Sequence, residues 1–122
     1  MRAVWFTGCI ATLLAVLPPA AHAQSTELKE KTYRFAIRCY VTNAMAATDR
    51  RYNASGTNTA RFRAMGQKSY STAYQLGRTL GKSEARIDED FNAYEAIFRS
   101  VFLRDDTSFQ QARSDCAHIG LM

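Results

Sequence analysis

The sequence predicts an all-α protein: a small four-helix bundle of the up-down type, closed by one disulfide and preceded by a cleaved signal peptide. Three observations support this prediction. Apolar residues recur at spacings of three and four, the period of a helix and not of a strand. Residues 24–122 contain no proline and are rich in alanine, arginine and glutamate, which favour helices. Two cysteines lie within the helical pattern, behind an apolar N-terminal segment.

The first 23 residues have the layout of a secretory signal peptide. Arg2 supplies a positive start, residues 3–17 are mostly apolar, and Ala21-His22-Ala23 provides the small-x-small pattern that precedes a cleavage site. The apolar run is shorter than the ~17–25 residues of a spanning helix and ends in two prolines, which disfavours an uncleaved anchor. We expect cleavage after residue 23, one domain over residues 24–122, no transmembrane segment after cleavage, and a periplasmic or secreted location.

The first mature helix is expected from about Ser25 or Thr26 to Thr48. Apolar side chains in this stretch occupy more than one stripe, which predicts a central position among the helices. The next stretch, from Asp49 to Asn58, combines charged residues with Asn, Ser and Gly and is therefore predicted to be a loop.

The second helix is expected over residues 59–80, ending at Gly81, a residue type that commonly follows a helix. Two glycines inside it, Gly66 and Gly77, each weaken a helix by about 1 kcal/mol relative to alanine. Together with the small residues Ser69 and Ala73 they form a side of low relief. We expect this side to let a neighbouring backbone approach closely.

The third helix, residues 83–104, has the clearest amphipathic pattern in the chain, and Ser83 is a good N-cap. Its apolar stripe runs at spacings of four, three, four and three through Ile87, Phe91, Tyr94, Phe98 and Val101. We expect this helix to be the main contributor to the core. The three adjacent acids at residues 88–90 are expected to lie on its solvated side.

A short fourth helix is expected after a turn at Asp105-Asp106. Thr107-x-x-Gln110 resembles a capping box at its start. The buried stripe predicted for this helix consists of Phe109, Ala112, Cys116 and Ile119, which follow one another at helical spacing.

Cys39 and Cys116 are predicted to form the disulfide, because exported proteins fold in an oxidising compartment. The disulfide would close a loop of 77 positions, which stabilises the fold by roughly 4–5 kcal/mol on the chain-entropy model. The alternative is a redox-active or metal-binding thiol. No Cys-x-x-Cys is present, and His118 is the one histidine left after cleavage, so we expect no metal site.

We predict no catalytic residues and no cofactor, because the sequence supplies no set of polar groups expected to converge in one cleft. Cys116-Ala117-His118 lies roughly where c-type haem-binding bundles carry Cys-x-x-Cys-His. The resemblance fails, since Arg113 stands in place of the first cysteine and Ala117 separates the other two residues. An alternative is a bundle that binds haem or another small molecule without a covalent link, with His118 and Met45 as haem ligands.

Charge is unevenly distributed along the chain. Residues 24–82 carry a net charge of +8, and residues 83–122 carry −4. The candidate partner-binding residues lie in and beside the first loop and are Arg50, Arg51, Tyr52, Arg61 and Arg63. For an exported protein, an acidic protein surface or an anionic envelope component is a more plausible partner than nucleic acid. The alternative is a solvated face that confers solubility only.

The sequence therefore predicts a small, non-catalytic binding or interaction protein. An inhibitor, an immunity-type protein or an envelope-stress adaptor would each fit this description. A haem- or small-molecule-binding bundle is the second hypothesis, and an enzyme is the third.

Overall fold

The computed structural model describes residues 19–122. The signal peptide predicted over residues 1–23 lies outside the described residues, except that residues 19–23 belong to the first helix. The described chain is all-helical, and its helices are α1 (Pro19–Thr48), α2 (Thr59–Thr79), α3 (Glu84–Arg104) and α4 (Asp106–His118). Of these, none combines the length and the apolar character needed to cross a membrane.

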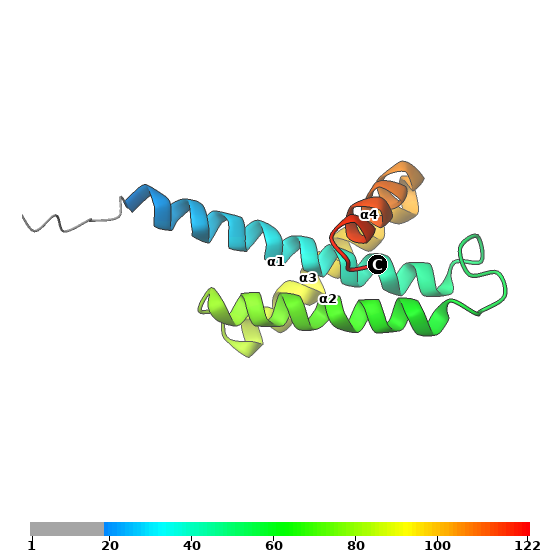
Figure 1. Cartoon of the computed structure of the whole chain (residues 1–122), viewed down its shortest axis with the longest axis horizontal. Coiled ribbons are helices and arrows are strands. Elements are labelled where there is room, and N and C mark those ends of the chain that lie inside the picture. The colour runs from blue at the N-terminus through cyan, green and yellow to red at the C-terminus, as the bar shows by residue number, and fades with distance from the viewer. Residues whose placement is uncertain (1–18) are drawn as a thin grey trace, which may run out of the picture.

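α1 is the centre of the arrangement. It lies antiparallel beside α2, and α3 crosses this pair obliquely before α4 returns toward α1 (Figure 1). α1 contacts each of the other three helices, as predicted for the first helix. Its described part reaches back to Pro19, beyond the start expected near Ser25, and the alanines between these positions favour a helix.

The starts of α3 and α4 are both capped by side chains. Ser83 Oγ accepts a hydrogen bond from the Arg86 backbone N–H at 3.2 Å, which confirms the predicted cap of α3. α4 is capped by Asp105, whose carboxylate accepts from the Thr107 backbone N–H at 3.0 Å and from Ser108 Oγ at 2.7 Å. The capping box predicted at Thr107 is therefore wrong. The helix starts one residue beyond Asp105, whose carboxylate satisfies its free N–H groups.

The low-relief side of α2 packs closely, as expected. Gly66, Ser69, Ala73 and Gly77 are all buried. A Cβ atom added at Gly77 would lie 2.9 Å from Ile87 of α3 and 3.0 Å from the Tyr33 ring of α1. At the end of α2, Gly81 has a φ of +79°, and the Lys82 N–H donates to the Gly77 carbonyl at 3.0 Å. This Schellman motif turns the chain toward α3.

The core is built mainly on α1, so the expectation that α3 is its main contributor is wrong. The fully buried α1 residues are Tyr33, Ala36, Ile37, Cys39, Val41, Thr42, Asn43 and Ala46. α3 buries four side chains, Ile87, Asp90, Phe91 and Phe102. Because α3 crosses the α1–α2 pair obliquely, only the first part of its apolar stripe is buried, and Tyr94, Phe98 and Val101 are half-buried. Two further apolar residues of α3, Ile97 and Leu103, are 54% and 74% exposed.

The disulfide and the C-terminal tail tie α4 to α1. The sulfur atoms of Cys39 and Cys116 are at bonding distance, with their Cα atoms 5.6 Å apart, in agreement with the predicted pairing. Beyond α4, the Leu121 N–H donates to the Cys116 carbonyl at 2.8 Å. The Leu121 carbonyl in turn accepts from Asn43 Nδ2 at 2.7 Å. The tail is thus fixed at the buried middle of α1. Ile119, predicted to be buried, is instead 50% exposed.

Candidate binding surface

The loop between α1 and α2 is held in one conformation by Asn53. Its side chain is 8% exposed, and its Nδ2 donates to the Ala47 carbonyl at 2.9 Å and to Thr59 Oγ1 at 2.6 Å. Its Oδ1 accepts from the Asn58 N–H at 2.9 Å. Since these bonds join both helix ends, the loop presents its other side chains from a fixed position. The Asn53 amide is fully used in these contacts.

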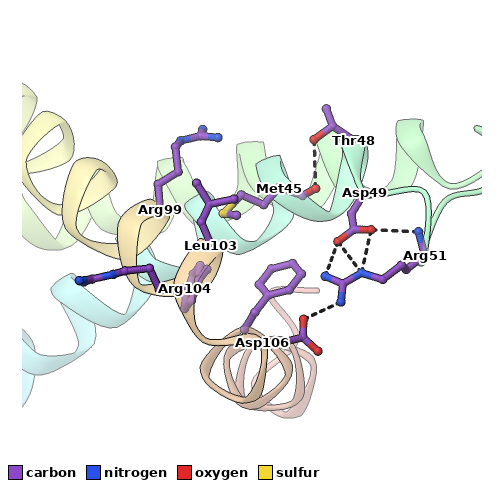
Figure 2. A pocket seen from close by; sticks show the side chains of 10 residues that line it. Met45, Thr48, Asp49, Arg51, Arg99, Leu103, Arg104 and Asp106 are labelled. Atoms are coloured by element: carbon purple, nitrogen blue, oxygen red, sulfur yellow. Dashed lines mark hydrogen bonds and ion pairs between the residues drawn. The ribbon is translucent and has the colours of Figure 1, made fainter.

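Arg51 joins the loop to the first turn of α4. Figure 2 shows its guanidinium between two carboxylates: Nη2 lies 2.8 Å from Asp49 Oδ2, and Nη1 lies 2.7 Å from Asp106 Oδ1. The hydrogen bonds from Arg51 hold the pKa of Asp49 below its usual value. The charge of Arg51 is therefore paired within the chain, and this candidate residue has a structural role.

Tyr52 lies under two guanidinium groups. The Cζ atom of Arg113 is 3.7 Å from the Tyr52 ring centroid, and that of Arg51 is 5.2 Å away. The half-buried ring packs on Phe109 of α4, with ring centroids 5.8 Å apart. The attraction between a guanidinium cation and an aromatic face favours the stacked orientation of Arg113 on Tyr52. Arg113 Nε is buried, and no hydrogen-bond partner for it is present among the described residues.

Arg113 also lines a pocket of about 400 Å³ together with Arg61. We call this the arginine pocket; its other lining residues are Gln110, Ser114, Ala117 and Met122. No acidic residue is among them. Arg61 is exposed and lies over the Phe62 ring at 5.1 Å. The pocket thus offers two guanidinium groups, a hydroxyl and an amide, which suit a carboxylate.

The five candidate residues do not form one continuous patch. Arg51 and Tyr52 lie together beside Arg113, and Arg61 shares the arginine pocket with Arg113. Arg63 lines a different groove, of about 440 Å³, between α1 and α2. Arg50 is exposed. Sequence analysis did not single out Arg113, which lies four residues after the buried Phe109 and lines the arginine pocket.

The pocket in Figure 2 has a volume of about 470 Å³ and lies where the end of α1 meets the α3–α4 turn. Its charged side chains are largely paired within the protein: Arg99 Nη2 lies 2.9 Å from Glu95 of the same helix, and Arg51 holds the two aspartates. Met45, one of the two candidate haem ligands, lines this pocket. His118, the other, is exposed in the last turn of α4 and is not among its lining residues.

Comparison of the chain with protein families, curated proteins and solved structures gives no match. The candidate surface therefore rests on the geometry of its own residues. Within the part of the chain that the structure describes, no three His, Cys, Asp or Glu side chains are grouped so that they could hold a metal ion.

Proposed function

We propose that this chain is an exported, non-catalytic binding protein that holds an acidic protein surface through its arginine pocket. In this proposal residues 1–23 are a signal peptide, and residues 24–122 form a single small four-helix bundle of the up-down type in the periplasm or outside the cell. An inhibitor, an immunity-type protein or an envelope-stress adaptor would each use such a contact.

One observation carries the binding proposal: two arginines share a pocket with no carboxylate in its lining. Arg51 is paired with Asp49 and Asp106, but no ion pair to Arg61 or Arg113 occurs in the described structure. Stacking on Tyr52 holds Arg113 in place, which lowers the entropy lost when it binds a carboxylate. Arginine and tyrosine are also enriched among the residues that dominate binding energy at protein interfaces.

Export is supported by the N-terminal sequence and by the cysteine pair. An apolar segment that ends in Ala21-His22-Ala23 is typical of a leader, and a disulfide persists in an oxidising compartment. Intact mass and N-terminal sequencing of protein from the envelope fraction should give a chain that begins at Gln24. Recovery of the full chain from membranes would contradict cleavage.

The binding proposal is tested by capture from envelope extract with the immobilised protein, comparing the parent with Arg61→Glu. Arg61 is exposed and makes no ion pair in the described structure, so the variant should melt like the parent. We expect it to retain much less partner, and parent capture should fall as salt rises, because exposed charges are screened.

The matched control is Arg78→Glu, an exposed arginine in the last turn of α2, at the opposite end of that helix (Figure 1). It should capture as much partner as the parent. Equal capture by all three proteins at low and high salt would contradict the proposal. Arg61-dependent binding to anionic vesicles, without a captured protein, would favour an anionic envelope component instead.

A further inference from the structure

A second hollow, away from the arginine pocket, runs between α1 and α3. It has a volume of about 340 Å³ and is lined by Lys31, Arg34, Phe35, Arg38, Tyr94, Ile97 and Phe98. A smaller hollow of about 270 Å³ shares Lys31 and Phe35 with it and reaches Ile119 beyond α4. We call the two together the α1–α3 groove. No acidic side chain lines either hollow.

The floor of the groove is apolar and open to solvent. Ile97 is 54% exposed and Ile119 is 50% exposed, while Phe35 and Phe98 are half-buried. Ile97 thus lines the larger hollow and Ile119 the smaller one, and the two hollows meet at Lys31 and Phe35. Contiguous exposed apolar surface with a polar rim is typical of an interaction site.

The rim on the α1 side is basic. Four of the lining residues share one face of α1, because they stand at i, i+3, i+4 and i+7: Lys31, Arg34, Phe35 and Arg38. Lys31 lies 3.4 Å from Glu27, a pair in which both side chains are about two-thirds exposed and which contributes little. Arg38 lies 3.0 Å from Asp115. Arg34 is exposed and has no ion pair among the described residues.

We propose that the α1–α3 groove binds an amphipathic helix of a partner protein, with acidic residues along the flank that faces Lys31 and Arg34. The apolar stripe of that helix would lie on Phe35, Ile97 and Phe98. Charge complementarity selects an acidic flank. This proposal does not depend on the arginine pocket.

The helices on both sides of the groove favour a helix over a strand as its occupant. A hollow between two helices accepts the side-chain ridge of a third. Strand addition needs an open sheet edge, and the described chain contains helices alone.

The test measures fluorescence anisotropy of a labelled helical peptide with the purified oxidised protein. The peptide carries leucines at i, i+3, i+4 and i+7 and glutamates along one flank. Two control peptides have the same composition in scrambled order, or lysines in place of the glutamates. We expect the amphipathic acidic peptide to bind at least about tenfold more tightly than either control.

Two exposed aliphatic residues of α3 provide matched variants. Ile97→Ser lies in the groove and should weaken the acidic peptide at least about tenfold. Leu103→Ser, at a side chain that is 74% exposed outside the groove, should leave binding unchanged. Arg34→Glu should remove most of the preference for the acidic over the lysine peptide, because the remaining Lys31 charge is then balanced. Arg61→Glu should have no effect, which separates this groove from the arginine pocket.

Three results would overturn the proposal. The first is absence of peptide binding at concentrations up to about millimolar, the weak end of specific association. The second is equal binding by the parent and Ile97→Ser. The third is Ile97-dependent sedimentation of the protein with anionic phospholipid vesicles in the absence of peptide binding, which would assign the groove to a lipid surface.

Discussion

The Tyr33 hydroxyl donates a hydrogen bond to Asp90 Oδ2 at 3.0 Å, across 57 positions of the sequence. Both residues are buried. Lys82 Nζ lies 3.4 Å from the same carboxylate oxygen and 3.4 Å from Glu30, and Arg86 Nε lies 3.1 Å from the other oxygen of Asp90. This network joins α1, the α2–α3 turn and the start of α3. Asp90 is therefore buried and paired, although its sequence context predicts a solvated position.

Replacing Asp90 should destabilise the fold much more than replacing its neighbour Asp88. Asp90→Ala leaves the buried Tyr33 hydroxyl without its acceptor and removes one of the two carboxylates beside Lys82, and we expect a loss of about 2–4 kcal/mol in the free energy of unfolding. Asp88 is exposed, so Asp88→Ala should change the free energy of unfolding by less than about 0.5 kcal/mol. Urea denaturation of the two variants and the parent measures the difference. Equal urea midpoints for Asp90→Ala and Asp88→Ala would show that the network around Asp90 does not stabilise the packing of α3.

The Tyr33 hydroxyl should also affect stability at alkaline pH. Burial, and then the hydrogen bond to Asp90, raises the pKa of Tyr33 well above the ordinary value of 10.0. The folded state therefore keeps this proton when the unfolded state loses it. The resulting stabilisation is complete below about pH 10 and is lost as pH rises toward the folded pKa. Tyr33→Phe lacks this effect, so the stability gap between parent and variant should narrow from about pH 8 to about pH 11. A gap that stays constant would contradict a buried, neutral Tyr33.

The local features of the fold could be predicted because neighbouring residues determine them. Ser83 caps α3 since its hydroxyl reaches an N–H three residues on, and Gly81 ends α2 since it adopts a positive φ without strain. The cysteine pairing could be predicted because Cys39 and Cys116 are the two cysteines of residues 24–122, while the third, Cys9, lies in the predicted signal peptide. Burial of Asp90 could not be predicted, because its partner Tyr33 lies on a different helix, and helical periodicity does not specify contacts between helices.

The candidate surface was predictable only in part, for the same reason. The sequence shows four arginines and a tyrosine in and beside one loop: Arg50, Arg51, Tyr52, Arg61 and Arg63. Whether each charge is free depends on α4, which brings Asp106 to Arg51 and adds Arg113 to the pocket with Arg61. These contacts join residues about half the chain apart, and only the packing of α4 against the loop creates them.

Loss of the disulfide should lower stability by roughly 4–5 kcal/mol on the chain-entropy model, less any relaxation of the native state. It joins residues 77 positions apart and ties α4 to the buried middle of α1. The double variant Cys39→Ala with Cys116→Ala should therefore unfold at a much lower urea concentration than the parent. Peptide mapping without reduction should recover the two cysteines in one linked pair. Two free thiols in the native protein would contradict the pairing and reopen the redox interpretation.

The two buried glycines of α2 should respond in opposite ways to alanine. Both substitutions remove the helix penalty of glycine, a gain of up to about 1 kcal/mol. At Gly66 the added methyl group would lie 3.5 Å from Asn43 Cβ, an ordinary contact, so Gly66→Ala should raise the free energy of unfolding. At Gly77 it would lie 2.9 Å from two atoms of Ile87 and 3.0 Å from the Tyr33 ring.

Neither Ile87 nor Tyr33 can move aside without cost, because both side chains are fully buried. Overpacking of this kind costs about 1–3 kcal/mol, which exceeds the gain in helix propensity, so Gly77→Ala should lower the melting temperature. Thermal denaturation of both variants under the same conditions shows whether each substitution raises or lowers the melting temperature. If Gly77→Ala melts higher than the parent, α3 does not pack against α2 and α1 as closely as the contacts at Gly77 require.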